Sequence, residues 1–499
     1  MRSGRTTPFW RGAAAGALAG LAAVALMELL ALGVGLKTVP DLLQGPLLGL
    51  LPGAVFGFLI DTLQHLGKVL EEAGLLLAMV LALGALGAVA ASVEARLQQW
   101  RPGLVAAAAG WLALTALSLA DAAGGGLTVL TAINSAAWAL VMAAWYWLWH
   151  RLLQPRETLD EVDLGRRRVA LLFPAGLAVL SLAVIGGLRV PEWLHALAGG
   201  DAPPGPVPAL TPVSDFYRVS KNLRDPVVVE SGWSLRLFGQ VGRELKLDLA
   251  HLRAVPQSKE VVTMECVSNL VGGNLMSTGR FTGIPLRDLL TMAEPNAGAR
   301  SVTYRAEDGF SESLPLNLVL ADPRILIALQ LNDQPLPVEH GFPARVLIPG
   351  RYGMKGPKWL KEIELTTTPQ GGYWEEQGWD REAIVKTTAR FDVPLLGSSL
   401  LSPVQLAGVA FAGVRGVHAV EWSADGGRSW HPAELEAPLS ELTWTRWRAT
   451  WRPAQEGAYT LVVRARDGSG QVQTGQEAPS FPNGASGYHR LQVRARPVG

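Results

Sequence analysis

Apolar positions are distributed very unevenly along this chain of 499 residues. Residues 12–190 contain long runs with almost no charge, whereas residues 210–499 mix charged and apolar positions with many prolines. An apolar run of about 20 residues is long enough for a helix to cross a bilayer. The pattern therefore predicts an all-α transmembrane bundle, within residues 1–195, followed by a soluble part of more than one domain.

Five apolar runs reach or approach the length of a membrane span: residues 12–36, 73–91, 103–120, 127–149 and 169–188. Glycines at positions 12, 16 and 20 of the first run have the spacing that lets helices pack closely. The first run is too long for the apolar core of a cleavable signal peptide.

A sixth uncharged segment, residues 42–60, contains Pro46 and Pro52. If it does not span, the arginine-rich loops all lie on one side, and only Lys37 and Lys68 lie in the short loops opposite. Basic residues accumulate in cytoplasmic loops. We therefore predict about five spans, a re-entrant or interfacial segment within residues 40–66, and a multi-pass cell-membrane protein whose soluble part is extracytoplasmic.

Two further features of the membrane half leave alternatives open. The Gly-Arg-Arg-Arg-Val sequence at 165–169 resembles an internal twin-arginine export signal, but ordinary anchoring by cytoplasmic arginines explains it equally. Histidine pairs can hold a haem. The predicted topology places His150 on the opposite side from His65 and His195, so no such pair emerges.

The soluble part divides by pattern into a linker and two domains. Residues 196–212 are a proline-rich linker. Residues 213–385 alternate short strands with short helices, which predicts an α+β domain. The expected elements are strands at 234–239, 261–265, 300–306 and 324–331, a strand entering a helix at 245–252, and a helix at 285–292.

Residues 386–499 contain short strands at regular spacing, expected at 404–411, 417–423, 444–451, 458–465 and 488–494. Turn signals such as Asp425-Gly426-Gly427 separate them. This arrangement predicts a β-sandwich of immunoglobulin type. Its tryptophans are expected to pack in the core and interfaces, because aromatic side chains dominate packing.

The net charge of +1 argues against a nucleic-acid-binding protein, which would carry a basic field. Cys266 is the only cysteine, so it forms no internal disulfide. It follows the strand predicted at 261–265 and precedes a glycine-rich loop that contains Asn269. A thiolate there suits a transition metal. The alternative is a small buried apolar residue, because free cysteine is often buried.

A second candidate segment places His340, Arg345, Arg351, Lys355 and Lys358 within about twenty residues, with glycine and proline turns between them. Cationic side chains on such turns suit a phosphate-bearing cofactor. A charged solvent-exposed loop is the alternative.

Taken together, these segments resemble the sulfite oxidase family of molybdenum enzymes. The resemblance covers residues 214–499 and is based on Cys-Val-Ser-Asn at 266–269, Arg-Phe-Thr-Gly at 280–283 and the whole of 335–360. Residues 386–499 resemble the dimerisation domain of the family, which implies a homodimer. The membrane half resembles the anchors of some bacterial members.

The resemblance implies a role for each matching residue. Cys266 matches the thiolate that ligates molybdenum in a molybdenum–molybdopterin cofactor. The catalytic residues would be Cys266, Lys221 and Tyr373. The cofactor-binding residues would be Asn222, Asn269, Phe281, His340, Arg345, Lys355 and Lys358.

The sequence also departs from the family pattern. Val271 stands where sulfite oxidases have an arginine that clamps the oxyanion, and Phe281 replaces a tryptophan. Lys221 or Arg280 would have to replace the missing cation. The resemblance nevertheless implies a membrane-anchored oxidoreductase that transfers oxygen atoms, by oxidising sulfite or a related small oxyanion.

Three alternative functions stay open, and the hypothesis also requires a partner for electron transfer. The chain could instead reduce an S-oxide or N-oxide, be a non-catalytic membrane-anchored assembly protein, or pass electrons to quinones through its membrane half. One cysteine cannot supply a CxxCH haem site or an iron–sulfur cluster. Electrons would therefore pass to a separate partner, a cytochrome or a quinone-linked protein.

Overall fold

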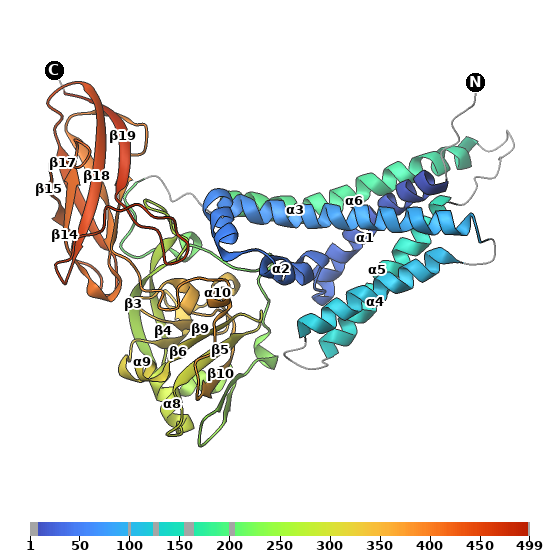
Figure 1. Ribbon diagram of the computed structural model, residues 1–499, viewed down its shortest axis with the longest axis horizontal. Coiled ribbons are helices and arrows are strands. Elements are labelled where there is room, and N and C mark those ends of the chain that lie inside the picture. Colours follow the sequence, from blue (N-terminus) through green and yellow to red (C-terminus); the bar gives the residue numbers. More distant parts are fainter. Residues whose placement is uncertain (1–7, 98–100, 123–128, 154–163, 199–204, 498–499) are drawn as a thin grey trace. The chain divides into compact units, whose positions relative to one another are not determined.

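The computed structural model describes residues 8–97, 101–122, 129–153, 164–198 and 205–497 (Figure 1). The chain separates into two compact units, one made of Met1–Leu50 with His65–Ala198 and the other of Leu51–Gln64 with Gly199–Gly499. Each unit has its own core. The arginine repeat at 165–169 lies in the helix Leu164–Ala198, and its side chains are outside the described part.

The first unit is helical, as its apolar runs predict (Figure 1, blue to green). Its helices are α1 (Pro8–Val34), α2 (Val39–Gly49), α3 (Gly53–Glu94), α4 (Pro102–Ala122), α5 (Val129–Leu153) and α6 (Leu164–Ala198). α3 begins in residues that belong to the second unit. Instead of a new span starting near residue 73, α3 runs unbroken from residue 53.

Within the described residues, four helical stretches are long and apolar enough to cross a membrane: Pro8–Val34, Leu66–Glu94, Pro102–Ala120 and Pro174–Pro191. The pair Val39–Leu48 and Gly53–Leu59, bent by 118°, would make a fifth as a broken span or a re-entrant loop. This bend lies in the segment predicted to be re-entrant. α5 covers the described part of the run expected at 127–149 but is not among the four, since Asn134, four tryptophans and Tyr146 lower its hydropathy.

Small residues bring α1 and α3 together. A Cβ atom on Gly12 would lie 2.5 Å from the Gly87 carbonyl oxygen, and one on Gly16 would lie 2.7 Å from that of Leu83. The glycine spacing therefore has the packing role that was predicted for it. In the same unit, Arg189 of α6 forms buried ion pairs with Glu28 of α1 at 2.7 Å and with Glu72 of α3 at 3.3 Å.

The second unit begins with an α+β region built on two sheets (Figure 1, green to gold). One sheet has the order β2-β1-β10-β5-β6, and the other has β3-β4-β7-β8 with β9 also paired to β7. The strands are β1 (Leu235–Gly239), β2 (Leu245–Leu247), β3 (Ser258–Glu265), β4 (Met276–Pro285), β5 (Ser301–Ala306), β6 (Ser311–Pro315), β7 (Leu326–Leu331), β8 (Gln334–Pro335), β9 (Arg345–Leu347) and β10 (Leu360–Thr366).

Three short helices complete this region: α7 (Leu249–Ala254), α8 (Leu286–Ala293) and α9 (Leu316–Ala321). α8 buries Leu286, Leu289 and Leu290 in the core shared by both sheets. The elements expected from the sequence are present here, and the turn at Asn332-Asp333 has two residues with positive φ. β4, β6 and β10 were not expected.

The C-terminal region forms two sheets over one core (Figure 1, orange to red). One sheet is β11-β13-β17-β16 and the other is β12-β19-β18-β14-β15. The strands are β11 (Thr388–Val393), β12 (Ser399–Leu401), β13 (Val404–Phe411), β14 (Val417–Ser423), β15 (His431–Pro432), β16 (Glu434–Leu435), β17 (Thr445–Trp451), β18 (Gly457–Asp467) and β19 (His489–Arg496). Trp422, Trp447 and Trp451 lie in the core between the sheets, as predicted.

Candidate active site

Cys266 lies directly after the last residue of β3, which pairs antiparallel with β4 along its whole length. Its backbone N–H donates to the Leu275 carbonyl at 2.9 Å, and its Sγ lies 3.0 Å from the Ser268 hydroxyl. The side chain is buried, and burial raises the pKa of the thiol while Ser268 opposes this. The strand end thus fixes one thiol in a place that water reaches poorly.

The loop after Cys266 is held by Asn269. Its side-chain amide donates to Glu265 Oε1 at 2.9 Å, and its Oδ1 accepts from the Leu275 N–H at 3.0 Å. Burial raises the pKa of Glu265 to about 7. The Asn269 side chain therefore ties the two ends of the loop together, and the cofactor contact that the resemblance implied stays a prediction.

Tyr217 was not among the predicted site residues, yet the structure places it beside the thiol. Its hydroxyl lies against Gly353, where an added Cβ would approach it to 2.8 Å. Burial raises the pKa of Tyr217, the charge of Cys266 raises it further, and that of Arg345 lowers it. Both groups therefore lie within electrostatic reach of one phenol. The only signal in the sequence was the position of Tyr217 shortly before Lys221.

Arg345 is the first residue of β9, and its guanidinium is buried. Its only described hydrogen bonds are long ones to backbone carbonyls, at 3.3 Å to His340 and 3.5 Å to Gly356, and its Nε has no partner. Burial lowers the pKa of Arg345 to about 10. A buried cation without a carboxylate is unfavourable unless an anion binds there.

His340 lies close to Arg345. Its ring packs edge-on against Phe216, with the two centroids 5.3 Å apart. Burial lowers the pKa of His340 to about 3, and the charges of Arg345 and Lys358 contribute in the same direction. The imidazole is therefore neutral near pH 7 and can donate or accept a hydrogen bond without adding charge.

Lys358 connects the segment that contains His340 and Arg345 to Val219, near the start of the α+β region. Its ammonium donates to the carbonyls of Val219 at 3.2 Å and Glu339 at 2.8 Å, and it lies 4.3 Å from the centre of the Trp359 ring. The structure therefore brings His340, Arg345 and Lys358 together, as the resemblance implied.

Lys221 and Tyr373 form a second group. The Lys221 ammonium lies 5.3 Å from the centre of the Tyr373 ring and donates to Asn222 Oδ1 at 3.0 Å and to the Asp308 carbonyl at 2.9 Å. Asn222 in turn donates to the Asp308 carboxylate at 2.9 Å. Two predicted catalytic residues, separated by more than 150 positions, are thus neighbours, and Asp308 holds Lys221 and Asn222 together.

Lys355 has a different environment from the one expected. It is fully buried and donates to Glu312 Oε1 at 2.6 Å and to Glu375 Oε1 at 2.7 Å. Glu375 belongs to α10 (Tyr373–Glu376), the short helix that begins with Tyr373. The described contacts of Lys355 therefore hold this helix in place, and the cofactor contact that the resemblance implied for Lys355 stays a prediction.

Phe281 and Arg280, which were also predicted to belong to the site, contact other side chains of the protein. Phe281 on β4 is fully buried and packs against Phe216 at a centroid distance of 6.1 Å. Arg280, which was a candidate for the missing substrate cation, pairs with Asp333 at 2.5 Å in an exposed ion pair. Val271 is half-buried. Asp333 thus already neutralises Arg280 in the structure, and the replacement of the absent arginine by Lys221 or Arg280 stays a prediction.

The C-terminal sheets also contact the cysteine loop, which sequence reasoning missed. Arg390 of β11 donates to the Gly273 carbonyl at 2.5 Å and pairs with Asp392 at 2.9 Å. The His489 ring of β19 lies so close to Gly272, where φ is +79°, that a Cβ there would be 2.5 Å from it. Glycine is needed at this position for both its conformation and its size.

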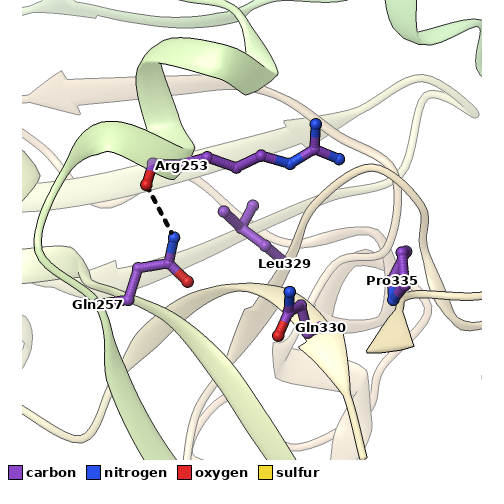
Figure 2. A pocket seen from close by; sticks show the side chains of 5 residues that line it. All are labelled: Arg253, Gln257, Leu329, Gln330 and Pro335. Atoms are coloured by element: carbon purple, nitrogen blue, oxygen red, sulfur yellow. Dashed lines mark hydrogen bonds between the residues drawn. The ribbon is translucent and has the colours of Figure 1, made fainter. Parts of the chain in front are cut away.

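A small surface pocket lies away from these groups. Figure 2 shows its lining, with the Arg253 side chain extended over Leu329 and with Gln330 and Pro335 on the opposite side. Gln257 closes one edge by donating to the Arg253 carbonyl at 3.2 Å. None of the predicted site residues lines this pocket.

The residues around Cys266 fit an anionic cofactor that carries a metal. A soft thiolate ligand is available, and Arg345 supplies a buried positive charge that no described carboxylate neutralises. Among the described residues, no group of three His, Cys, Asp or Glu side chains could hold a metal ion. A metal bound to Cys266 would therefore take its other ligands from the cofactor.

Comparison with known proteins agrees with this chemistry. Residues 222–374 match the family model described as the oxidoreductase molybdopterin binding domain. The chain is 29% identical over 319 residues to sulfite oxidase of Gallus gallus, covering 54% of this chain and 69% of that protein. It is 31% identical over 147 residues to the uncharacterized oxidoreductase YuiH of Bacillus subtilis (strain 168), covering 30% of this chain and 72% of that protein.

Among solved structures, the sulfane dehydrogenase SoxCD from Paracoccus pantotrophus is similar, with a TM-score of 0.50 and 18% identity. The similarity covers 57% of this chain and 80% of that chain. At this identity the likeness concerns the fold alone. For the sulfite oxidases of mouse, rat, macaque and human, the match spans 56–62% of their length.

Proposed function

Because this chain belongs to the sulfite oxidase family of molybdopterin-dependent oxidoreductases, we propose that it is a membrane-anchored enzyme that transfers an oxygen atom to or from a small substrate. The observation that carries the proposal is that a buried thiol, Cys266, and a buried guanidinium without a described carboxylate, Arg345, both lie within electrostatic reach of Tyr217. Burying a guanidinium costs free energy unless an anion binds it, and a thiol at the same place could ligate a metal.

Each group has a proposed role. Cys266 would ligate the molybdenum, which when bound supplies two-electron oxygen-atom transfer. His340, Arg345 and Lys358 would hold the pterin and its phosphate through charge-assisted hydrogen bonds. Lys221 would hold the substrate oxygen beside Tyr373. Asn269 would keep the cysteine loop closed.

A small oxyanion such as sulfite is the first candidate substrate, because the Lys221 ammonium places a positive charge beside Tyr373. A second candidate, a neutral S-oxide or N-oxide, is favoured by a specific observation. Asp308 lies 3.7 Å from the Lys221 ammonium, Arg280 is paired elsewhere, and Val271 carries no charge. A site with so little net positive charge would hold a doubly charged oxyanion weakly.

We further propose that the apolar helices of the first unit anchor the chain in the cell membrane, with the second unit on the extracytoplasmic side. Four candidate spans support the anchor. The distribution of arginines supports the orientation. A separate cytochrome or quinone-linked protein would exchange electrons with the site, and a homodimer through residues 386–499 stays a prediction.

The test is metal content combined with a matched variant. Purified full-length protein should contain about one molybdenum per chain, and Cys266→Ser should lose most of it, because an alcohol is a poor ligand for a soft site. Ser268→Ala, which removes the hydroxyl beside the thiol, is the control and should keep the metal. Stoichiometric molybdenum in the Cys266→Ser protein would contradict the proposal.

Turnover then separates the two substrate classes. Wild-type protein should be assayed with sulfite in the oxidative direction, and with methionine sulfoxide and trimethylamine N-oxide in the reductive direction. Activity on any one of them assigns the direction of transfer. A metal-loaded protein inactive on all three would retain the cofactor assignment and reject this choice of substrates.

A further inference from the structure

One face of the C-terminal sheets is unusually basic. Along β19, Leu491, Val493 and Ala495 point into the core, so Arg490, Arg494 and Arg496 point outward. β18 pairs with β19 so that Val462 lies opposite Arg490 and Ala458 opposite Arg494. Arg464 and Arg466, two and four residues after Val462, point to the same side, and Arg464 is already paired with Glu421 at 2.8 Å. We call Arg466, Arg490, Arg494 and Arg496 the arginine face.

These arginines differ from those on the other C-terminal sheet. There, Arg446 pairs with Glu436 and Arg448 pairs with Glu434 at 3.0 Å, across neighbouring strands. Within the described part of the chain, none of the four residues of the arginine face has an ion pair. Arg466 and Arg490 donate only to backbone carbonyls, those of Gly470 at 2.9 Å and Gly426 at 3.2 Å.

Exposed leucines lie next to the arginine face. Leu395, Leu396 and Leu401 are 57%, 71% and 56% exposed, respectively. β12 runs parallel to β19, with Leu401 opposite Arg496 and Ser399 opposite Arg494, and the Gly397 N–H donates to the Gln492 carbonyl. We call Leu395, Leu396 and Leu401 the leucine edge. Large apolar side chains this exposed, on a short edge strand and in the segment just before it, invite association unless something covers them.

We propose that the arginine face and the leucine edge together dock on the surface of an anionic lipid bilayer. Basic side chains are attracted to anionic headgroups, and neighbouring apolar side chains enter the boundary between headgroups and acyl chains. The inference rests on the proposed membrane anchorage. An anchor in the same chain keeps this surface close to the bilayer, so a weak contact is enough to populate the docked state.

Two other binding partners fit this combination of exposed arginines and leucines less well. An acidic protein would explain the arginines but would leave the three leucines without a role. A second copy of the chain, related by a two-fold axis through this surface, would bring arginines close to arginines. A bilayer of anionic lipid satisfies both the charge and the apolar side chains.

The experiment uses the full chain in lipid nanodiscs, with a fluorophore attached at Ser399→Cys and a spin-label quencher near the lipid headgroups. Ser399 is exposed and lies between the leucines. Cys266 is buried, and wild-type protein treated with the same label gives the background. We expect strong quenching in discs that contain phosphatidylglycerol and much weaker quenching in pure phosphatidylcholine. A label at Gln405→Cys, exposed on the other sheet, should be quenched in neither.

Variants separate the contribution of the arginines to docking from that of the leucines. Arg494→Gln with Arg496→Gln should reduce the docked fraction severalfold, as should 1 M salt, because both weaken attraction to the headgroups. Leu395→Ser with Leu396→Ser should also reduce it. Arg446→Gln with Arg448→Gln removes the same number of arginines from the other sheet and should change nothing. Circular dichroism and molybdenum content show that each variant is folded.

The outcomes are distinct. If the chain fails to enter nanodiscs, the anchorage itself is wrong. If it enters them but the Ser399→Cys label is not quenched in anionic discs, or is quenched equally in the arginine variant, the docking is overturned. If the label is shielded from aqueous iodide in detergent, where no bilayer is present, protein covers this surface, and the lipid proposal is wrong.

Discussion

The Lys355 ammonium lies 2.6 Å from the Glu312 carboxylate in a place where neither side chain is exposed. Glu375, at 2.7 Å, completes a buried group of one cation and two anions. Burial raises the pKa of Glu312, and Lys355 opposes this shift. The group fixes α10, the helix that begins with Tyr373, to the segment that carries Lys358.

Replacing Lys355 with methionine should destabilise the second unit. The buried Glu312 carboxylate would then lose its only described cation, while Glu375 would keep Arg381 at 3.0 Å. Leaving a buried charge unpaired in this way costs about 3–5 kcal/mol and lowers the apparent melting temperature by roughly 10 °C. Differential scanning calorimetry of the full chain would measure the change. Lys361→Met, which removes an exposed lysine 3.4 Å from Glu307, should have little effect. Equal melting temperatures for both variants would contradict the buried group.

Replacing Arg345 with methionine should weaken cofactor binding without destabilising the protein. Without the cofactor, the wild-type protein holds a buried charge that no described carboxylate neutralises, so the variant should melt at the same temperature or higher. With the cofactor, the variant should lose an anion contact. The molybdenum and pterin content of purified protein should fall about tenfold or more. A variant that retains both in full would show that Arg345 does not bind the cofactor.

Replacing Lys221 with methionine should affect charged substrates most. A hydrogen bond to a charged group is worth about 1.5–3 kcal/mol, so kcat/KM for sulfite should fall by roughly 10- to 100-fold. The decrease for a neutral sulfoxide should be much smaller. Lys221→Arg, which keeps the charge, should recover part of the sulfite activity. Equal losses for charged and neutral substrates would assign Lys221 to positioning Tyr373 instead.

Acid sensitivity should come partly from His489. Its Nδ1 accepts from the Phe391 N–H at 3.0 Å, and burial, with a contribution from Arg390, lowers the pKa of His489 to about 4. The unfolded chain takes up this proton near pH 6.5. Stability from this group is therefore complete above about pH 6.5 and is lost as the pH falls towards 4.

His489→Asn provides the comparison, since its side-chain oxygen can accept the same hydrogen bond without titrating. Its melting temperature should fall less between pH 6.5 and 4.5 than that of the wild type. His418→Asn, which changes an exposed histidine on β14, should follow the wild type. Parallel curves for all three proteins would show that His489 does not control the acid response.

Much of the fold could be predicted because its signals are local. β13 and β14 begin and end where the pattern of apolar residues and turns placed them, since alternation along a strand decides which side faces the core. The strand before Cys266 ends at Glu265, as predicted, but begins three residues earlier, at Ser258. β4 was missed because burial on both faces removes the alternation. β10 was missed although Lys361, Glu362 and Glu364 are not buried, since an irregularity between Leu360 and Glu362 shifts its alternation.

Only part of the candidate site could be predicted from the sequence. The thiol after a strand and the basic residues among glycines were visible as a pattern, and so was the division into an apolar and a soluble half. Which cation faces an anionic cofactor was not visible. Lys355 and Arg345 look alike in sequence, yet carboxylates more than 15 residues away neutralise only Lys355. Contacts between distant segments decide this, because the free energy of a buried charge depends on the partners that folding brings to it.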